Sequence, residues 1–311
     1  MNINFIGNKN KFFAFSIILT VIVIIATFVN GVKMDIQFQG GYIFTYSYEG
    51  EIYKDSLEKE LAKKLNQDVS VQKTTDIGSG INKLVISFGA NKALDANVKK
   101  NLKEIFDNKF SVNKLKEIQV SNVDSAVGKE FFTKCMVAVA AAAVFIIIYI
   151  AIRFKKIGGL SAGVMAVIAL IHDVTMIYGT FVILKMPLSD SFIAGCLMIL
   201  GYSINDTIII YDRIRENKKI YGSKMSIGDL VNKSINQSFN RTINTTFTTV
   251  MSSAIVLVVA LIYGVSSIVP FILPLMVGMI TGAYSTICIA GPLWVVWQNK
   301  KRNKRLAKIE Q

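Results

Sequence analysis

An acidic residue stands in the middle of a strongly apolar stretch of this sequence, GYSINDTIIIYDRIREN at residues 201–217. Asp206 falls within a predicted membrane span, while Arg213 and Arg215 mark the point where that span reaches water. A carboxylate in hydrocarbon costs about 2.5–3.5 kcal/mol on insertion scales, so ionisable groups at such positions are usually functional. We interpret Asp206, with its neighbour Asn205, as part of an ion path. The alternative is a hydrogen bond that only holds two helices together.

A second acidic residue, Asp173, ends a stripe of small side chains. Ala162, Ala166, Ala169 and Asp173 follow one another at spacings of four, three and four residues, so they share one helix face on which another helix can pack closely. Asp173 is a second candidate for the ion path, and a helix cap or an interhelical hydrogen bond is an equally good interpretation. His172, the one histidine, has no second ligand at a suitable spacing, so no metal site is predicted.

A polar stripe runs through NRTINTTFTTVMSS, which opens the fifth apolar segment. Its members recur at spacings of three and four residues: Ser238, Arg241, Thr245, Thr248 and Ser252. Because such a stripe has no purpose against lipid, we expect it to face the interior of a helix bundle, toward water or toward Asp206. The alternative is that the hydroxyl groups bond to carbonyls of their own helix, which explains single Ser or Thr residues but not a stripe that contains an arginine.

These groups belong to a chain that is too apolar for an ordinary soluble domain. Its 311 residues are 52% hydrophobic, with a mean hydropathy of +0.46. The last apolar segment contains three prolines, so its span is expected to be shorter, near 272–294. The first apolar segment, residues 12–29, is longer than the apolar region of a signal peptide, and no A-x-A cleavage site follows it. We therefore expect it to be a retained membrane helix. Windows of about 19 residues predict six spans, at 12–29, 133–152, 160–184, 191–211, 243–263 and 268–297.

The distribution of charge predicts the orientation of these spans. The formal net charge is +14. It lies almost entirely in four segments that share one side of the membrane if the spans alternate: Lys9 with Lys11, residues 153–156, residues 212–241 and residues 300–311. The positive-inside rule makes that side the cytoplasm, so both ends of the chain are predicted to lie there. In a membrane protein, excess positive charge indicates topology and contact with anionic lipid, not with nucleic acid.

Residues 30–130 predict a small α+β domain on the outer face of the membrane. Alternating and helical apolar spacings occur in this order: strand 34–48, helix 54–66, strands 69–74 and 83–89, helix 94–108 and strand 116–123. The order βαββαβ is that of a ferredoxin-like fold. The predicted fold class is therefore an α-helical polytopic membrane protein with six transmembrane helices and a ferredoxin-like α+β extracytoplasmic domain between helices 1 and 2.

The predicted domain boundaries follow from these elements. They are an N-terminus with helix 1 at 1–29, the outer domain at 30–130, a five-helix bundle at 131–297 and a basic tail at 298–311. The bundle includes a cytoplasmic loop at 212–241, in which apolar residues at helical spacing predict an amphipathic helix at the membrane interface. The three cysteines lie in predicted spans and are interpreted as packing residues; neither a disulfide framework nor a cofactor is predicted.

Three motifs carry a resemblance to a known family. GYSINDT and DRIREN, followed by NQSFNRTINTTFTT, resemble the SecD/SecF family of protein-export membrane proteins, part of the resistance–nodulation–division superfamily. The resemblance implies a protein that works with the SecYEG channel and couples ion flow down the membrane potential to late steps of preprotein export. It also implies that Asp206 is the family's fourth-span carboxylate, that Arg241 is the arginine of its R-T-I-N-T motif, and that His172 and Asp173 are its third-span pair.

The resemblance implies partners and a location as well. A SecD-type subunit is expected as a separate chain, with SecYEG, a translocating preprotein, and YajC and YidC as further partners, in the cytoplasmic membrane of a bacterium. One position departs from the family pattern. An acidic residue usually precedes F-x-G-G, and here that position holds Gln37, which weakens any specific role for it.

The sequence leaves three functions in competition. In the first, a subunit for protein export without enzymatic chemistry, Asp206 takes up a proton or binds Na⁺, and Thr245, Thr248 and Arg241 complete the path. A carboxylate beside amides and hydroxyls suits either ion. The second is half of a permease of the same superfamily that moves lipids or small molecules; such permeases usually carry two halves in one chain. The third, an intramembrane aspartyl protease, is disfavoured because no G-x-G-D motif is present and Asp212 lies at the water's edge.

Overall fold

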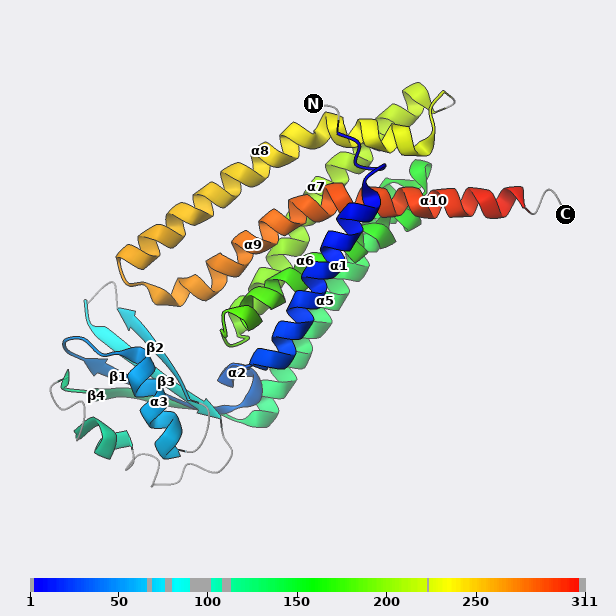
Figure 1. Ribbon diagram of the computed structural model, residues 1–311. Helices are drawn as coiled ribbons and strands as arrows, with labels where there is room; N and C mark the ends of the chain where they lie inside the picture. The colour runs from blue at the N-terminus through cyan, green and yellow to red at the C-terminus, as the bar shows by residue number, and fades with distance from the viewer. Residues whose placement is uncertain are drawn as a thin grey trace.

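Long helices form a bundle, and a small sheet with its own helices lies at one end of it (Figure 1). The N-terminus and the projecting last helix lie away from the sheet, toward the other end of the bundle (Figure 1). The computed structural model describes residues 3–65, 69–75, 80–89, 102–107, 113–222 and 224–307.

Six helical stretches among the described residues are long and apolar enough to cross a membrane, as predicted. Pro270 stands in the first turn of the sixth stretch, where a missing N–H is tolerated, and neither Pro274 nor Pro292 ends the stretch, so it is longer than the expected 272–294. It begins as α9 (Val269–Ser285), passes through a π-helical turn (Thr286–Ala290) and continues as α10 (Gly291–Leu306). The other five are α1 (Lys9–Asn30), α5 (Ser125–Arg153), α6 (Gly159–Ile183), α7 (Asp190–Tyr221) and α8 (Ile227–Ile262).

Helices α6, α7 and α9 form the buried centre of the bundle, whereas α1, α5 and α8 expose most of their apolar side chains. The small-residue stripe of α6 faces this centre, and all three of its alanines are buried. The hydroxyl of Tyr211 in α7 donates to the carbonyl of Ala162, and Ala169 packs against Ile289 and Ala290. The prediction that other helices approach α6 along this stripe is therefore confirmed.

The predicted loop at 212–241 is mostly helix, which corrects the sequence-based expectation. Only residues 222–226 separate α7 from α8. The side chain of Ser226 accepts a hydrogen bond from the backbone N–H of Asp229, so α8 starts there and not at the next apolar run. The predicted amphipathic helix is the first part of α8. Its apolar face packs on Phe5 and Val295 instead of lying on lipid, because Leu230, Val231 and Ile235 share one core with them.

The sheet domain contains four antiparallel strands. Their order is β2-β3-β1-β4, and the core between sheet and helices includes Phe44, Leu57, Leu61 and Leu102. Helix α3 (Lys54–Leu65) and a helical segment at 102–107 supply the helical side of this core. Residues 94–101 and 108 of the predicted second helix lie outside the described part of the chain. The strands are β1 (Gly41–Tyr48), β2 (Val69–Thr75), β3 (Asn82–Gly89) and β4 (Lys116–Val123).

The first predicted strand, 34–48, is wrong at its start, where a short helix α2 (Ile36–Gln39) replaces it. Asp35 caps this helix, because its side chain accepts a hydrogen bond from the backbone N–H of Gln37 at 3.0 Å. Gly40 ends it at φ +81°, against the backbone of Ser125, where no Cβ would fit. Phe38, only 1% exposed, inserts between the rings of Phe131 and Phe132 of α5. Helix α2 thus anchors the sheet domain to the bundle.

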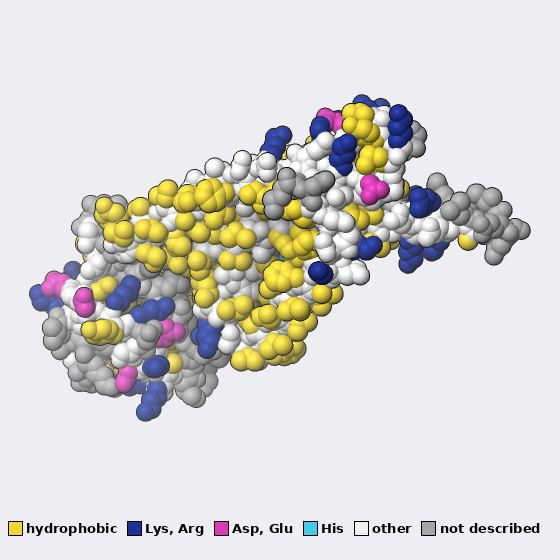
Figure 2. Space-filling model, turned by 45° about the horizontal axis from the view of Figure 1, so that its top comes forward, with side chains coloured by type: hydrophobic (Ala, Val, Ile, Leu, Met, Phe, Trp, Pro, Cys, Tyr) yellow, Lys and Arg dark blue, Asp and Glu magenta, His cyan; other side chains and the backbone are white. Residues whose placement is uncertain are grey.

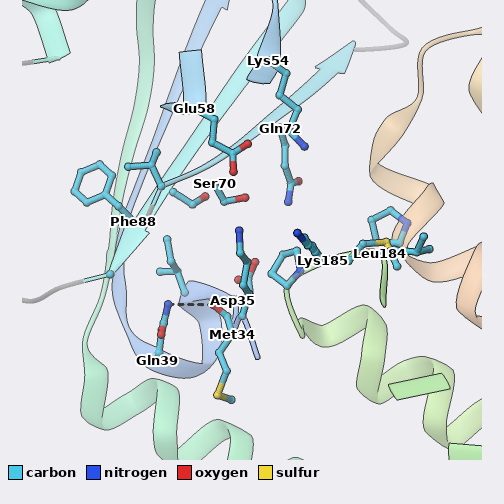
Figure 3. A pocket seen from close by; sticks show the side chains of 18 of the residues that line it. Met34, Asp35, Gln39, Lys54, Glu58, Ser70, Gln72, Phe88, Leu184 and Lys185 are labelled. Atoms are coloured by element: carbon cyan, nitrogen blue, oxygen red, sulfur yellow. Dashed lines mark hydrogen bonds between the residues drawn. The ribbon is translucent and has the colours of Figure 1, made fainter. Parts of the chain in front are cut away.

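A second attachment joins the chain after α1 to the α6–α7 turn. The N–H of Asp35 donates to the carbonyl of Leu188 at 2.8 Å, and the N–H of Leu188 donates to the carbonyl of Lys33 at 2.9 Å. Beside this joint, a cleft of about 540 Å³ lies between the sheet and the helix ends. Figure 3 shows Asp35, Glu58 and Lys185 around this cleft. Burial raises the pKa of Asp35, and the charge of Asp190 adds to the effect.

Candidate ion site in the helix bundle

Asp173 is fully buried at the junction of three central helices. Its Oδ2 atom accepts hydrogen bonds from Ser203 Oγ of α7 and Ser285 Oγ of α9, each at 2.8 Å. Its Oδ1 lies 3.3 Å from Nδ1 of His172. A buried carboxylate with this set of donors is held in one orientation, and it joins α6, α7 and α9. The interhelical hydrogen bond that the sequence left open is therefore present, whether or not Asp173 also takes part in ion movement.

Asp206 is buried too, with 1% of its surface exposed, but its surroundings differ. Its Oδ2 atom has no hydrogen-bond partner among the described residues. The guanidinium of Arg241 on α8 is close enough for its charge to act on this carboxylate. A buried carboxylate oxygen without a donor is costly unless it is protonated or meets water or a cation. Asp206 therefore has an oxygen that can accept a further hydrogen bond, a proton or a cation, whereas both oxygens of Asp173 have partners.

Further buried oxygens that have no partner in the described part of the chain lie on the same two helices. Tyr202 precedes Asp206 by one turn of α7, and Thr242 and Thr246 lie one turn apart on α8, which packs against α7. Hydroxyl groups of this kind can both donate to and accept from water. We call these three hydroxyls and the Oδ2 atom of Asp206, none of which has a partner among the described residues, the α7–α8 polar seam.

A π-helical turn lies next to this region. Thr286, its first residue, has its hydroxyl 3.1 Å from that of Thr207, and both hydroxyls reach toward the carbonyl of Ser203. π-Turns are rare and often occur at functional sites. Ser285 and Thr286 were missed by the sequence analysis, because two small polar residues inside a long apolar run do not interrupt it. Their side-by-side position in YSTIC is the one signal that could have indicated them.

The predicted polar stripe of α8 does not face the bundle in this chain, so that expectation was wrong. Arg241, Thr248 and Ser252 are exposed and Thr245 is half-buried, while the buried face consists of Ser234, Ser238, Thr242 and Thr246. The hydroxyls of Thr245, Thr248 and Ser252 donate to carbonyls of their own helix. Asn205 of α7 is exposed as well. The predicted stripe thus starts at a buried serine and then turns toward the outside of the bundle.

The candidate residues therefore divide into two groups. Asp173 and Asp206 are both buried at the centre, linked through α7 by Ser203, which bonds Asp173 and lies three residues before Asp206. Asn205, Thr248 and Arg241 lie on the outer surface of α7 and α8. No group of three His, Cys, Asp or Glu side chains suited to a metal ion occurs among the described residues. What the geometry offers is a buried carboxylate, Asp206, with one oxygen that has no partner among the described residues.

The sequence and the fold both match known proteins. Residues 101–300 match the family model "Protein export membrane protein SecD/SecF, C-terminal". The SecF translocase subunit of Sebaldella termitidis is 32% identical over 238 residues, which cover 76% of this chain and 73% of that protein. The SecF translocase subunit of Calditerrivibrio nitroreducens is 34% identical over 241 residues, which cover 75% of each chain.

A solved structure extends this similarity to the fold. SecDF from Thermus thermophilus, described as a translocon-associated membrane protein, superposes with a TM-score of 0.76 at 28% identity. The match covers 96% of this chain but only 39% of the SecDF chain, so this chain corresponds to less than half of that protein. The matched regions include the α7–α8 polar seam and most of the bundle. The chain therefore belongs to the SecD/SecF family of protein-export membrane proteins.

Proposed function

We propose that this chain acts as a SecF-type subunit of the protein translocase and, with a SecD-type partner, couples ion flow to the export of preproteins through the SecYEG channel. One observation carries the ion-coupling part of the proposal. Asp206 is buried inside a membrane-length helix and keeps one carboxylate oxygen without a partner among the described residues. Intramembrane carboxylates of this kind are expensive to keep and usually serve ion paths.

The surroundings of Asp206 support a path that crosses the bundle. Tyr202, Thr242 and Thr246 supply hydroxyls on one side of it, and Arg241 supplies a fixed positive charge at the start of the apolar part of α8. Neutralising Asp206 with a proton or Na⁺ removes its attraction to Arg241 and alters the packing of α7 on α8. Each charge that crosses 100 mV supplies about 2.3 kcal/mol, enough to shift a conformational equilibrium of a few kcal/mol.

The exposed polar face of α8 supports a membrane partner. Arg241, Asn244 and Thr248 are exposed on a helix of membrane length. Polar groups on that surface are costly against lipid, so we infer that a SecD-type subunit covers them. Family membership favours this export role over a permease that moves lipids or small molecules. SecYEG, the preprotein, YajC and YidC are proposed as further partners on the resemblance alone.

We further propose that the sheet domain is ferredoxin-like and lies outside the cytoplasm. The strand order β2-β3-β1-β4, with helices on one side, supports the ferredoxin-like assignment. The basic residues of α10 and of the α5–α6 turn lie at the bundle end remote from the sheet, which supports a cytoplasmic location for that end (Figure 1).

Replacing Asp206 by asparagine tests the proposed function. Asp206→Asn keeps the size of the side chain and its hydrogen-bonding capacity but removes the exchangeable charge, so ion-dependent stimulation of preprotein export is expected to fall to the level measured without the subunit. The measurement is translocation into membrane vesicles with and without an imposed ion gradient. Asp190→Asn is the matched control, because Asp190 belongs to the same helix but lies exposed at its first turn, and export should be unchanged.

Two outcomes separate function from folding. The Asp206→Asn variant is expected to insert and to co-purify with its SecD-type partner as wild type does. If that variant stimulates export normally under an ion gradient, Asp206 is a packing residue and the proposal fails. Replacing Na⁺ by a large organic cation at fixed pH identifies the ion: export that persists indicates protons, and export that stops indicates sodium.

A further inference from the structure

A groove of about 530 Å³ lies where α5, α6 and α10 meet, at the bundle end remote from the sheet domain. None of the residues that line it belongs to the α7–α8 polar seam or to the Asp173 cluster. Apolar lining comes from Leu160, Val164 and Met165 of α6, with Trp297 of α10 beside them. Its charged lining residues are Lys155, from the turn between α5 and α6, and Lys301, from α10.

Two glycines and one serine determine the shape of this groove. Gly158 adopts φ +92° at the turn before α6, and a Cβ on Gly159 would meet the carbonyl of Ala151, so α5 and α6 approach closely there. The Oγ atom of Ser161 accepts hydrogen bonds from Trp294 Nε1 at 3.3 Å and Gln298 Nε2 at 3.1 Å. These bonds fix α10 against the first turn of α6 and thereby place Trp297 and Lys301 beside the groove.

The charges of this groove are unbalanced. No acidic side chain is among the described residues that line it, and neither Lys155 nor Lys301 forms an ion pair within the described chain. The neighbouring basic residue Arg153 differs, because it pairs with Asp212. Figure 2 shows further Lys and Arg side chains on α10 and the adjoining end of the bundle, and hydrophobic side chains along the flanks of the helices. The site is therefore positive at its charged positions and otherwise apolar.

The apolar residues of the groove are open to a ligand. Leu160 is 66% exposed, Val164 38% and Trp297 49%. Leu160 and Val164 stand one turn apart on α6, so they form a continuous apolar strip along the helix. An indole beside lysines at the end of a membrane helix is typical of the headgroup region, where the amphipathic ring and the long basic side chains reach both hydrocarbon and phosphate.

We propose that this groove binds one anionic phospholipid, with its phosphate between Lys155 and Lys301 and an acyl chain along Leu160 and Val164. The charge of the site selects an anionic headgroup, and the exposed strip accepts hydrocarbon. A basic pocket between membrane helices is the setting in which such headgroups are bound. The site goes beyond the proposed export function and does not depend on it, because it lies apart from Asp206 and its ligand is part of the membrane itself.

Fluorescence of Trp297 tests this proposal. The chain has two tryptophans, and Trp294 is 3% exposed, so Trp294→Phe leaves Trp297 as the single reporter beside the groove. This change removes one of the two hydrogen bonds to Ser161 but keeps the bond from Gln298, which still joins α10 to α6. The full chain is reconstituted in phosphatidylcholine vesicles in which part of the lipid is replaced by phosphatidylglycerol with brominated acyl chains, which quench nearby tryptophan. We expect brominated phosphatidylglycerol to quench Trp297 more strongly than an equal fraction of brominated phosphatidylcholine.

Lysine variants make the test specific. Lys155→Gln and Lys301→Gln are each expected to weaken the preference for phosphatidylglycerol about fivefold, since one basic residue near the surface contributes about 1 kcal/mol. Lys301→Arg should keep it. Lys304→Gln is the matched control, because it removes the same charge from the same helix but does not line the groove. Native mass spectrometry of wild type, with both tryptophans intact, should retain phosphatidylglycerol in preference to phosphatidylcholine.

Two results would overturn the proposal. Equal quenching by the two brominated lipids means that the groove does not distinguish headgroups and is lined by ordinary boundary lipid or covered by a protein partner. A preference for phosphatidylglycerol that Lys155→Gln, Lys301→Gln and Lys304→Gln all reduce equally means that the basic end of the bundle attracts anionic lipid in general, without a bound lipid in this groove.

Discussion

Two buried carboxylates, Asp173 and Asp206, lie in the same bundle but differ in how many hydrogen-bond partners they have. Two serine hydroxyls and a histidine nitrogen surround Asp173, whereas one oxygen of Asp206 has no partner among the described residues. A fully satisfied buried polar group contributes to a fixed structure, and an unsatisfied one is ready to take up a ligand. At the scale of single residues, this contrast shows Asp173 in a hydrogen-bond network between helices and supports the proposal that Asp206 is the group that takes up an ion.

Arg241 tests whether charge alone is enough near Asp206. A guanidinium stays charged at any working pH and presents several donors in a fixed fork, whereas a lysine offers one mobile point charge. We expect Arg241→Lys and Arg241→Met to insert and assemble normally but to reduce ion-dependent export stimulation to near background, as measured in the vesicle translocation assay. Arg213→Lys is the control at the same end of the bundle, since Arg213 binds Gln237 and Glu216 on an exposed surface, and it should export normally.

Two other outcomes for Arg241 would contradict this expectation. If the lysine variant works and the methionine variant fails, a positive charge is sufficient and the argument from fork geometry is wrong. If both variants work, Arg241 only marks the boundary of the membrane, as an exposed arginine can do by reaching the lipid headgroups.

Sequence reasoning was effective at the residue scale where an isolated residue contradicts its surroundings. Asp173 and Asp206 stood out because charge is costly inside an apolar run. Ser203, Ser285 and Thr286 gave no such signal, since their importance comes from partners on other helices. The direction of the α8 stripe was wrong for a related reason. Spacing fixes which residues share a helix face, but the packing of α8 on α7 and α9 decides which face is buried.

At the scale of elements, the joint between sheet and bundle depends on a four-residue helix, α2. The sequence predicted a strand here because Ile36 and Phe38 alternate with polar residues. The cap by Asp35 and the left-handed Gly40 make those residues helical instead, and Phe38 then enters the α5 surface. The family's acidic position is Gln37 in this chain, and the capping carboxylate is supplied two residues earlier, by Asp35.

Asp35 makes the stability of this joint dependent on pH. Burial, with Asp190 nearby, raises its pKa in the folded protein, so the folded state holds this proton more tightly than the unfolded state does. The resulting loss of stability is absent at pH values below the ordinary pKa and grows as the pH rises through the raised one. Asparagine can cap α2 without a charge, so Asp35→Asn should raise the melting temperature at neutral pH and leave it unchanged at acidic pH, as measured by thermal unfolding in detergent.

Two comparisons isolate the charge from the cap. Asp35→Ala removes the cap and the charge together, so it should cost about 1 kcal/mol at acidic pH and less at neutral pH, where the loss of the buried charge offsets part of the lost cap. Asp124→Asn is the matched control, because Asp124 caps α5 in the same way but is exposed, and it should not raise the melting temperature at neutral pH. An increase for Asp35→Asn that is equal at both pH values would contradict the role of burial.

At the scale of the whole molecule, length and apolarity were sufficient to predict six membrane-length helices, and the strand segments of the sheet domain were identified by their alternation. The connections between helices were less predictable from the sequence. Helices α7 and α8 extend through the segment expected to be a loop. The cap by Ser226 is local, but the burial of Leu230 and Val231 depends on Phe5 and α10. Contacts between segments far apart in the sequence, such as Asn232 with Phe5, are outside the reach of local patterns.

The orientation of the molecule in the membrane is the last prediction. Both ends of the described chain lie at the bundle end opposite the sheet domain (Figure 1), and the excess of Lys and Arg gathers there. Positive residues are retained on the cytoplasmic side, so the sheet domain is expected outside. In a variant without the native cysteines, a membrane-impermeant thiol reagent applied to intact cells should label Tyr53→Cys, an exposed position of the sheet domain, and should label Lys304→Cys only after the membrane is opened. The native Cys135, Cys196 and Cys288 lie in spans, so replacing them by alanine should leave export unchanged and serves as the control.

The opposite labelling pattern would contradict this orientation. If Lys304→Cys is labelled in intact cells and Tyr53→Cys is protected, the sheet domain lies inside the cell, and the proposed ion path through Asp206 runs in the other direction.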